Sequence, residues 1–332
     1  MKSDKRTELI KKIFSLKTED EFVEIAMEIF AFQSQHNDVY KKYLHLLGTE
    51  IQKVSSFDDI PFLPVSMFKT HRVITGNTPA GQIFKSSGTG GGRRSYHYIA
   101  DPGLYKASYL RCFELFYGSP GNYCILALLP SYLERSDSSL VYMAGGLAEK
   151  SRHPESGFYL NDHTRLAETI KELERNNRNV LLMGVSFALL DLVEKHSLPL
   201  KNTIVMETGG MKGRRKEMTR EELHSIIISK TGLKNVHSEY GMTEMFSQAY
   251  SKGEGKFRCP PWMAVKIRDV YDPFTYLPEG RRGGVNVIDL ANIDSCAFLE
   301  TADLGRMLPG GEFEILGRFD NSDIRGCNLL SV

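Results

Sequence analysis

Short apolar runs that alternate with polar helical stretches constrain the fold of this chain more than any other feature. Each run is bounded by glycine, proline or charged clusters; the runs are Tyr123–Leu129, Val180–Met183, Thr203–Met206 and Gly284–Leu290. Residues 166–176 have the pattern of a surface helix and precede the run that begins at Val180. Buried strands that alternate with helices are typical of a sheet covered by helices. We therefore predict an α/β fold.

The first fifty residues have a different pattern. Between residues 8 and 47, apolar residues recur at helical spacing, as at Phe22, Ile25 and Ile29, which predicts two or three amphipathic helices. Such stripes usually pack on a core and take no part in chemistry. We divide the chain into a helical N-terminal region at 1–83, an α/β domain at 84–320 and a C-terminal tail at 321–332.

Charge and cysteine content exclude several classes of protein. The 42 basic and 41 acidic residues give a net charge of +1, so no overall field favours nucleic acid or an anionic membrane. The longest apolar run, 180–193, is shorter than the ~20 residues that span a bilayer, and the charged N-terminus does not resemble a signal peptide. The cysteines form no CxxC pair, which argues against a zinc site or a disulfide framework; they are Cys112, Cys124, Cys259, Cys296 and Cys327. We expect a cytoplasmic protein without an integral membrane segment or a nucleic-acid partner.

Residues 84–95, FKSSGTGGGRRS, have the composition of a phosphate-binding loop. Glycines let the backbone N–H groups approach an anion, hydroxyls add donors, and Arg93 or Arg94 supplies positive charge. The spacing fits neither GxGxxG nor the Walker pattern. A surface turn would account for the glycines equally well.

Residues 237–245, HSEYGMTEM, combine groups that suit the parts of a nucleotide. The ring of Tyr240 can stack on a purine, the Thr243 hydroxyl can bond a phosphate oxygen, and Glu244 is a hard ligand for Mg²⁺. As an isolated string, the segment is better explained as a turn with a helix cap, in which Thr243 is the N-cap and Glu244 lies in the first helical turn.

Two further stretches, TADLGR at 301–306 and GRFDNSDIRGCNL at 317–329, offer candidates for ribose hydroxyls. Asp303 could accept a hydrogen bond and Arg318 could donate one. Taken singly, both are by default solvated loop residues.

In chain order, five motifs resemble the successive core motifs of the AMP-forming adenylating superfamily. They are SSGTGGG at 86–92, TGG at 208–210, YGMTE at 240–244, TADLG at 301–305 and GRFD at 317–320. The chain further resembles the short branch that includes the acyl-protein synthetase subunit of the bacterial bioluminescence fatty-acid reductase. That similarity is carried by IPFLPVSMFK at 60–69, LPSYLERSDSSLVYM at 129–143 and RGCNLL at 325–330.

The resemblance implies the large N-terminal-type domain of adenylate-forming enzymes, with a helical N-terminal elaboration and without the mobile C-terminal lysine domain. It implies ATP and Mg²⁺ as cofactors. Thr243 would contact the α-phosphate, Glu244 would hold Mg²⁺, Asp303 the ribose hydroxyls, and Arg318 the ribose or phosphate side. The implied nucleotide-binding residues are Ser86, Ser87, Gly88, Thr89, Gly90, Gly91, Gly92, Gly209, Gly210, Tyr240, Gly241, Asp303 and Arg318.

The sequence departs from the superfamily pattern in two places. Arg93 and Arg94 stand where longer relatives keep a lysine downstream of the glycines, which preserves charge but changes geometry. Only 14 residues follow Arg318, too few for the domain that carries the catalytic lysine in full-length relatives. Lys212 or Arg214 would then neutralise the phosphate, or the first step is slow.

Cys327 stands where the acyl-protein synthetase branch has its acyl-accepting cysteine. Nine residues separate it from Arg318, a reach of up to about 30 Å when extended. Arg325 would favour the thiolate, the nucleophilic form. The alternative is that Cys327 is a small buried apolar residue.

These observations together predict an enzyme that activates a carboxylic acid, most simply a fatty acid, to acyl-AMP. The acyl group would pass to Cys327 and then to a partner such as an acyl reductase or another acyl-accepting protein. Two alternatives stay open, an acid:CoA ligase and a nucleotide-binding remnant without catalysis. Candidates for the acyl pocket are Val185, Phe187 and Met211, although core packing explains them equally well.

Overall fold

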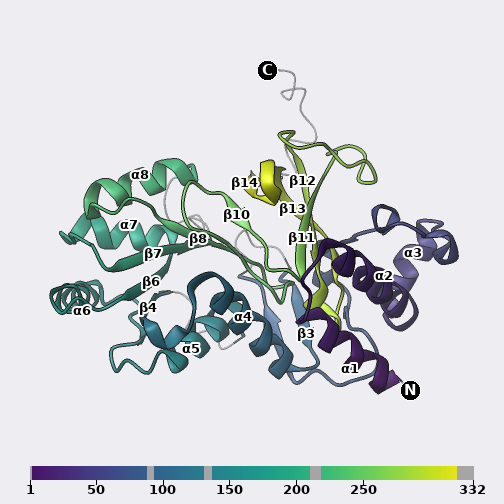
Figure 1. The fold of residues 1–332 in the computed structure, drawn as a ribbon, viewed down its shortest axis with the longest axis horizontal. Coiled ribbons are helices and arrows are strands. Elements are labelled where there is room, and N and C mark those ends of the chain that lie inside the picture. Colours follow the sequence, from purple (N-terminus) through teal and green to yellow (C-terminus); the bar gives the residue numbers. More distant parts are fainter. Residues whose placement is uncertain (1, 88–92, 131–136, 210–217, 320–332) are drawn as a thin grey trace.

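The computed structural model describes residues 2–87, 93–130, 137–209 and 218–319 (Figure 1). The α-helices in these ranges are α1 (Lys2–Ile13), α2 (Glu19–His36), α3 (Asp38–Leu46), α4 (Pro102–Tyr117), α5 (Ser139–Ser151), α6 (His163–Arg175), α7 (Ser186–Lys195) and α8 (Arg220–Thr231). In this part of the chain, no helix has both the length and the apolar content needed to cross a membrane.

Two β-sheets are formed by strands β1 (Leu63–Pro64), β2 (Gln82–Lys85), β3 (Tyr96–Ile99), β4 (Cys124–Leu128), β5 (Gly157–Phe158), β6 (Val180–Val185), β7 (Thr203–Thr208), β8 (His237–Tyr240), β9 (Ala249–Ser251), β10 (Phe257–Arg258), β11 (Met263–Arg268), β12 (Gly283–Asp289), β13 (Phe298–Met307) and β14 (Phe313–Arg318). Within the described ranges, the large sheet has the order β11-β12-β13-β14-β10-β9-β8-β7-β6-β4-β5, and β1 pairs with β13. Strands β2 and β3 form a separate antiparallel hairpin.

The large sheet has a parallel half and an antiparallel half, which meet at β8. Strands β5, β4, β6, β7 and β8 run parallel to their neighbours, whereas β8 pairs with β9 in the antiparallel sense. Every residue of β4 and β6 is buried, as expected for strands with helices on both faces. Figure 1 shows α7 and α8 on one side of the parallel strands, and α4 and α5 on the other.

The N-terminal helices pack on the segment that joins β12 to β13. Gln33 of α2 is fully buried; its amide nitrogen donates to the carbonyls of Asn292 and Ile293, at 3.1 and 2.9 Å, and its oxygen accepts from the Ala297 N–H at 2.9 Å. A buried amide whose donors and acceptor are all satisfied by backbone groups, the Ser295 carbonyl included, fixes this contact in one register. The segment held in this way contains Asn292, which is part of the short helix η5 (Leu290–Asn292).

The structure confirms the α/β fold and the strands expected at the four apolar runs, which correspond to β4, β6, β7 and β12. The surface helix expected at 166–176 is α6, and the N-terminal stripe forms α1 to α3. The domain boundaries after residues 83 and 320 stay predictions.

Candidate functional site

The predicted motifs gather at the carboxyl ends of β7 and β8. Thr208 is the last residue of β7, and Gly209 follows it. Tyr240 is the last residue of β8, the parallel neighbour of β7, and Gly241 follows it. In open α/β sheets, ligands bind outside the carboxyl ends of the strands. This edge of the sheet is therefore where a ligand site is expected on geometric grounds.

Tyr240, Asp303 and Arg318 form one contact group, although they are far apart in sequence. The Tyr240 hydroxyl donates to Asp303 Oδ2 at 2.8 Å, and Arg318 Nε lies 3.2 Å from Asp303 Oδ1. Asp303 and Arg318 are paired across β13 and β14, which explains why these two motifs meet. Asp303 is 7% exposed as a residue, and burial raises the pKa of its carboxyl, while the Arg318 charge and the Tyr240 hydrogen bond act in the opposite direction.

Thr243 and Glu244 lie in a turn between β8 and β9, so the expected helix start at Thr243 is wrong. The reason is tertiary: Asp289 Oδ2 accepts from the N–H groups of Phe246 and Ser247, at 2.7 and 2.9 Å. These donors are satisfied by a carboxylate from β12, so the backbone does not need a helix to pair them.

The Glu244 carboxyl is buried beside the hairpin of β2 and β3, which we call the glycine-rich hairpin because it flanks the glycine-rich segment of the sequence. It is 7% exposed, and burial raises its pKa, while a hydrogen bond with the Ser95 side chain and the charge of Arg318 act in the opposite direction. Ser95 closes the hairpin, because its N–H donates to Ser86 Oγ at 2.9 Å and its carbonyl accepts from the Ser86 N–H at 3.1 Å. The structure thus brings Ser95, which is paired with Ser86 at the base of the serine- and glycine-rich loop, into contact with Glu244.

Several predicted residues lie outside the described ranges. They are Gly88, Thr89, Gly90, Gly91, Gly92, Gly210, Met211, Lys212, Arg214 and Cys327. Ser87 is described and partly buried. Val185 and Phe187 are buried, at 0% and 4% exposed, where β6 passes into α7, and their role in an acyl pocket stays a prediction.

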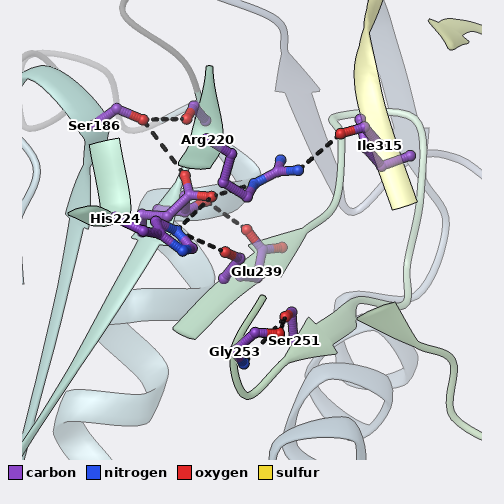
Figure 2. Close-up of polar contacts among 11 residues, drawn as sticks. Ser186, Arg220, His224, Glu239, Ser251, Gly253 and Ile315 are labelled. Atoms are coloured by element: carbon purple, nitrogen blue, oxygen red, sulfur yellow. Dashed lines mark hydrogen bonds and ion pairs between the residues drawn. The ribbon is translucent and has the colours of Figure 1, made fainter. Parts of the chain in front are cut away.

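A buried carboxylate that the sequence analysis missed supports the turn after β7. Arg220 Nε donates to Glu207 Oε1 at 2.8 Å, His224 Nε2 lies 3.9 Å from the same oxygen, and Ser186 Oγ lies 3.4 Å from Oε2 (Figure 2). Burial alone would raise the pKa of Glu207, but His224 and Arg220 together hold it below the ordinary value. The Ser186 hydroxyl also donates to the Gly209 carbonyl at 2.7 Å, so this network fixes the position of Gly209.

Arg220 extends this network to the antiparallel half of the sheet. Its Nη1 donates to the Ile315 carbonyl on β14 at 2.8 Å (Figure 2). Arg220 is placed by a capping box, in which Thr219 Oγ1 accepts from the Glu222 N–H and the Glu222 carboxylate accepts from the Thr219 N–H. The same β14 carries Arg318, so Arg220 ties the Gly209 turn to the strand that contacts Asp303.

Glu239, directly before Tyr240, is a second buried carboxyl that the sequence analysis missed. The Thr208 hydroxyl donates to its Oε2 (Figure 2). A Cβ at position 241 would lie 2.5 Å from Glu239 Oε1, so only glycine fits after Tyr240 without displacing this carboxyl. Burial raises the pKa of Glu239 to about 7; the Thr208 hydrogen bond lowers it, and the charge of Glu207 raises it further.

We expect Glu239→Gln to remove a pH dependence of stability. The carboxyl pKa rises from 4.5 in the unfolded chain to about 7 in the folded protein, so the folded state binds more protons between these values. The free energy of unfolding of the wild type should therefore fall as pH rises through this window, by at most about 3 kcal/mol. Denaturant unfolding of both proteins at about pH 5 and about pH 8 measures the difference. An identical pH response in the variant would contradict the assignment.

Two cavities lie away from this site, and neither is lined by Tyr240, Glu244 or Asp303. One, of about 250 Å³, is lined by Asp58, Asp59, Ile60, Pro61, Phe62, Pro273, Phe274 and Tyr276. The other, of about 520 Å³, is lined by Leu115, Phe116, Asn235, Tyr250, Lys252, Gly253, Glu254, Lys256, Arg258 and Glu312.

Comparison with known proteins identifies the fold. No protein-family model matches the chain, and neither does any curated protein. Among solved structures, ATP-bound MatB from Rhodopseudomonas palustris matches with a TM-score of 0.56 at 19% identity, over 74% of this chain and 49% of that one. An open conformation of 2-hydroxyisobutyryl-CoA ligase, in complex with 2-HIB-AMP and CoA, matches with a TM-score of 0.69 at 16% identity, over 92% of this chain and 72% of that one.

A third match is O-succinylbenzoate coenzyme A synthetase (MenE) from Bacillus subtilis, in complex with ATP and magnesium ion. Its TM-score is 0.52 at 16% identity, over 73% of this chain and 51% of that one. The chain therefore has the fold of the large N-terminal domain of adenylate-forming enzymes. It spans about half the length of the MatB and MenE structures that it matches.

Proposed function

We propose that this protein uses Mg-ATP to convert a carboxylic acid, most simply a fatty acid, into an acyl-adenylate. The observation that carries the proposal is the convergence of three separate motifs on one sheet edge. Tyr240, Asp303 and Arg318 contact one another there, and Glu244 lies against the base of the glycine-rich hairpin. The three nucleotide- or adenylate-bound neighbours share the fold that places these motifs together.

Each residue has a role that its chemistry suits. The Asp303 carboxylate accepts hydrogen bonds from the ribose hydroxyls, and the Tyr240 hydroxyl and Arg318 keep that carboxylate oriented. Thr243 donates to the α-phosphate. The segment from Ser86 to Gly92 holds the other phosphates, and Gly209 and Gly210 border the adenine with Tyr240 and Gly241. These groups position the phosphates and neutralise their charge, and phosphoryl chemistry chiefly requires these two effects.

Glu244 is the candidate magnesium ligand. Among the described residues, no three His, Cys, Asp or Glu side chains cluster in a way that could hold a metal. A single buried carboxylate is still a reasonable fit, because Mg²⁺ is commonly held by one or two carboxylates together with substrate phosphates and water. The raised pKa of Glu244 agrees with this, since a nearby cation would compensate the cost of burying its charge.

The proposed acceptor of the activated acyl group is the Cys327 thiol, with delivery to a partner such as an acyl reductase. This part of the proposal depends on the resemblance to the acyl-protein synthetase branch. A second candidate is an acid:CoA ligase, which is favoured by the 2-hydroxyisobutyryl-CoA ligase neighbour in complex with CoA. The two differ in one observable, which is whether a thioester forms on the protein or on added CoA.

Isotope exchange between pyrophosphate and ATP tests the adenylation step. We expect purified protein to catalyse the exchange only with Mg²⁺ and a suitable carboxylic acid, when acids from short to long chain are supplied one at a time. Chelation of Mg²⁺ should abolish the exchange. Glu244→Gln, which keeps the side-chain volume but removes the charge, should lower it by about 100-fold. Tight ATP binding without exchange for any acid would instead indicate a nucleotide-binding protein without catalysis.

A further inference from the structure

His97 connects the glycine-rich hairpin to the turn that carries Thr243 and Glu244. It lies on β3 and is fully buried, and its Nδ1 is 2.7 Å from the Thr243 carbonyl oxygen. Its Nε2 is 3.1 Å from Asn292 Oδ1, and the Asn292 side-chain nitrogen donates to the Glu244 carbonyl at 2.7 Å. Two consecutive carbonyls of the turn are therefore held by one histidine and one asparagine.

The surroundings of His97 favour a structural contact over proton transfer. The rings of Phe68 and Phe246 pack against the imidazole, each with a centroid distance of 5.5 Å. Burial lowers the pKa of His97 to about 4, and the contacts with Thr243 and Asn292 act in the opposite direction. Both ring nitrogens face oxygen atoms and a neutral ring has only one N–H, so His97 donates from Nδ1 to the Thr243 carbonyl, the shorter contact, and Nε2 lies beside Asn292 Oδ1 without a hydrogen bond.

The turn is held from both sides. Its carbonyls at 243 and 244 contact the His97–Asn292 pair, while the N–H groups at 246 and 247 donate to the Asp289 carboxylate. Asn292 belongs to the segment that is anchored by Gln33 of α2, so the pair has a rigid base. The hairpin meets the same turn a second time through the contact of Ser95 with the Glu244 carboxyl.

We propose that His97, together with Asn292, is a positioning residue that keeps the glycine-rich hairpin in register with Thr243 and Glu244. Its catalytic effect rests on the proposed function, since the hairpin and the turn supply the phosphate and magnesium contacts there. The positions of two groups that bind the same nucleotide must agree within a fraction of an ångström, and an error of 1 Å can cost about 100-fold in rate.

Four substitutions separate the contacts of His97. His97→Asn places an amide nitrogen near the position of Nδ1 and keeps the donor to Thr243, whereas His97→Gln places one near Nε2, beside Asn292 Oδ1, and lacks that donor. His97→Leu and Asn292→Leu each replace one polar side chain of the pair with an apolar one. We expect His97→Leu to lower kcat for pyrophosphate exchange by about 100-fold, with KM for ATP changed less than about threefold. The loss should be smaller for His97→Asn than for His97→Gln, and His97→Leu combined with Asn292→Leu should cost less than the product of the single losses.

His237 supplies a matched control. It is a partly buried histidine whose pKa burial and the Lys252 charge also lower to about 4, and its Nδ1 contacts the Tyr117 hydroxyl at 3.1 Å. It lies at the opposite end of β8 from Tyr240. His237→Leu should therefore lower the unfolding midpoint and leave kcat for exchange within about threefold of wild type. An equal kcat loss in His97→Leu and His237→Leu would overturn the positioning role.

Amide hydrogen exchange keeps this inference separate from the proposed function. His97→Leu should raise exchange in β2 and β3 and in residues 242–245 together, while β6 and β7 keep their protection. If wild type catalyses no pyrophosphate exchange with any acid, the proposed function fails. The positioning role of His97 is then tested only by whether His97→Leu raises hydrogen exchange in the hairpin and in residues 242–245 together. Loss confined to the hairpin, or equal loss throughout the sheet, would overturn it.

Discussion

Replacing Asp303 by alanine should lower kcat/KM for ATP in pyrophosphate exchange by about 100- to 1,000-fold, because charge-assisted hydrogen bonds contribute roughly 1.5–3 kcal/mol each. The carboxylate has one oxygen at the Tyr240 hydroxyl and the other at Arg318, so it is fixed before a ligand arrives. A preorganised acceptor for two ribose hydroxyls saves the cost of ordering that group on binding. Steady-state exchange at varied ATP concentration measures the effect, and equilibrium binding of ATP should weaken in parallel.

Three further variants test whether Asp303 acts on the ligand or only on the fold. Asp303→Asn keeps the shape but removes the charge. Since burial raises the pKa of Asp303, its charged form destabilises the folded state, and the asparagine variant should be at least as stable as wild type near pH 7.5 while losing activity. Tyr240→Phe and Arg318→Ala remove the neighbours that orient the carboxylate and should each cost less activity than Asp303→Ala. If Asp303→Asn retains full activity, Asp303 does not bind the ribose.

The fold was predictable where local pattern and burial agree. The apolar runs at β4, β6 and β7 consist of residues that are all or nearly all buried in the parallel half, so a continuous apolar run predicts them correctly. The antiparallel half was harder, because β9 and β10 have only three and two residues and carry no usable periodicity. Sequence pattern also cannot give strand order, and it is the pairing of β13 with β14 that places Asp303 opposite Arg318.

The candidate site was predictable only where a motif existed. Tyr240, Asp303 and Arg318 belong to short strings in a characteristic order, and the structure brings them into contact. His97 and Glu207 belong to no such string. An isolated histidine in a sequence is indistinguishable from a surface residue, and its partner Asn292 is almost two hundred positions away. The helix expected at Thr243 failed for a related reason, since the carboxylate of Asp289, 43 residues beyond Phe246, pairs the turn's N–H groups instead.

The acceptor of the acyl group is the part of the proposal that lies farthest from the described residues. The structure describes the chain as far as Phe319, whose N–H donates to the Ala302 carbonyl at 2.8 Å next to Asp303. Cys327 is eight positions further along, so an extended linker could span up to about 28 Å. That length would let the thiol reach an adenylate held at the Asp303 edge.

Cys327→Ser should abolish acylation of the protein and leave adenylation intact. In the proposed transfer, the Cys327 thiolate attacks the acyl carbonyl, the bond to the AMP oxygen breaks, and a thioester forms as AMP leaves. Wild type incubated with ATP, Mg²⁺ and a labelled fatty acid should become labelled, and neutral hydroxylamine should release the label as the hydroxamate. The serine variant should take up little label while its pyrophosphate exchange stays within about threefold of wild type, because serine lacks a thiolate at neutral pH.

Cys259→Ser is the matched control, since burial raises the pKa of the Cys259 thiol and makes it a poor nucleophile. Equal labelling of wild type and Cys327→Ser would assign Cys327 a structural role, and thioester formed only on added CoA would make the acid:CoA ligase the correct function.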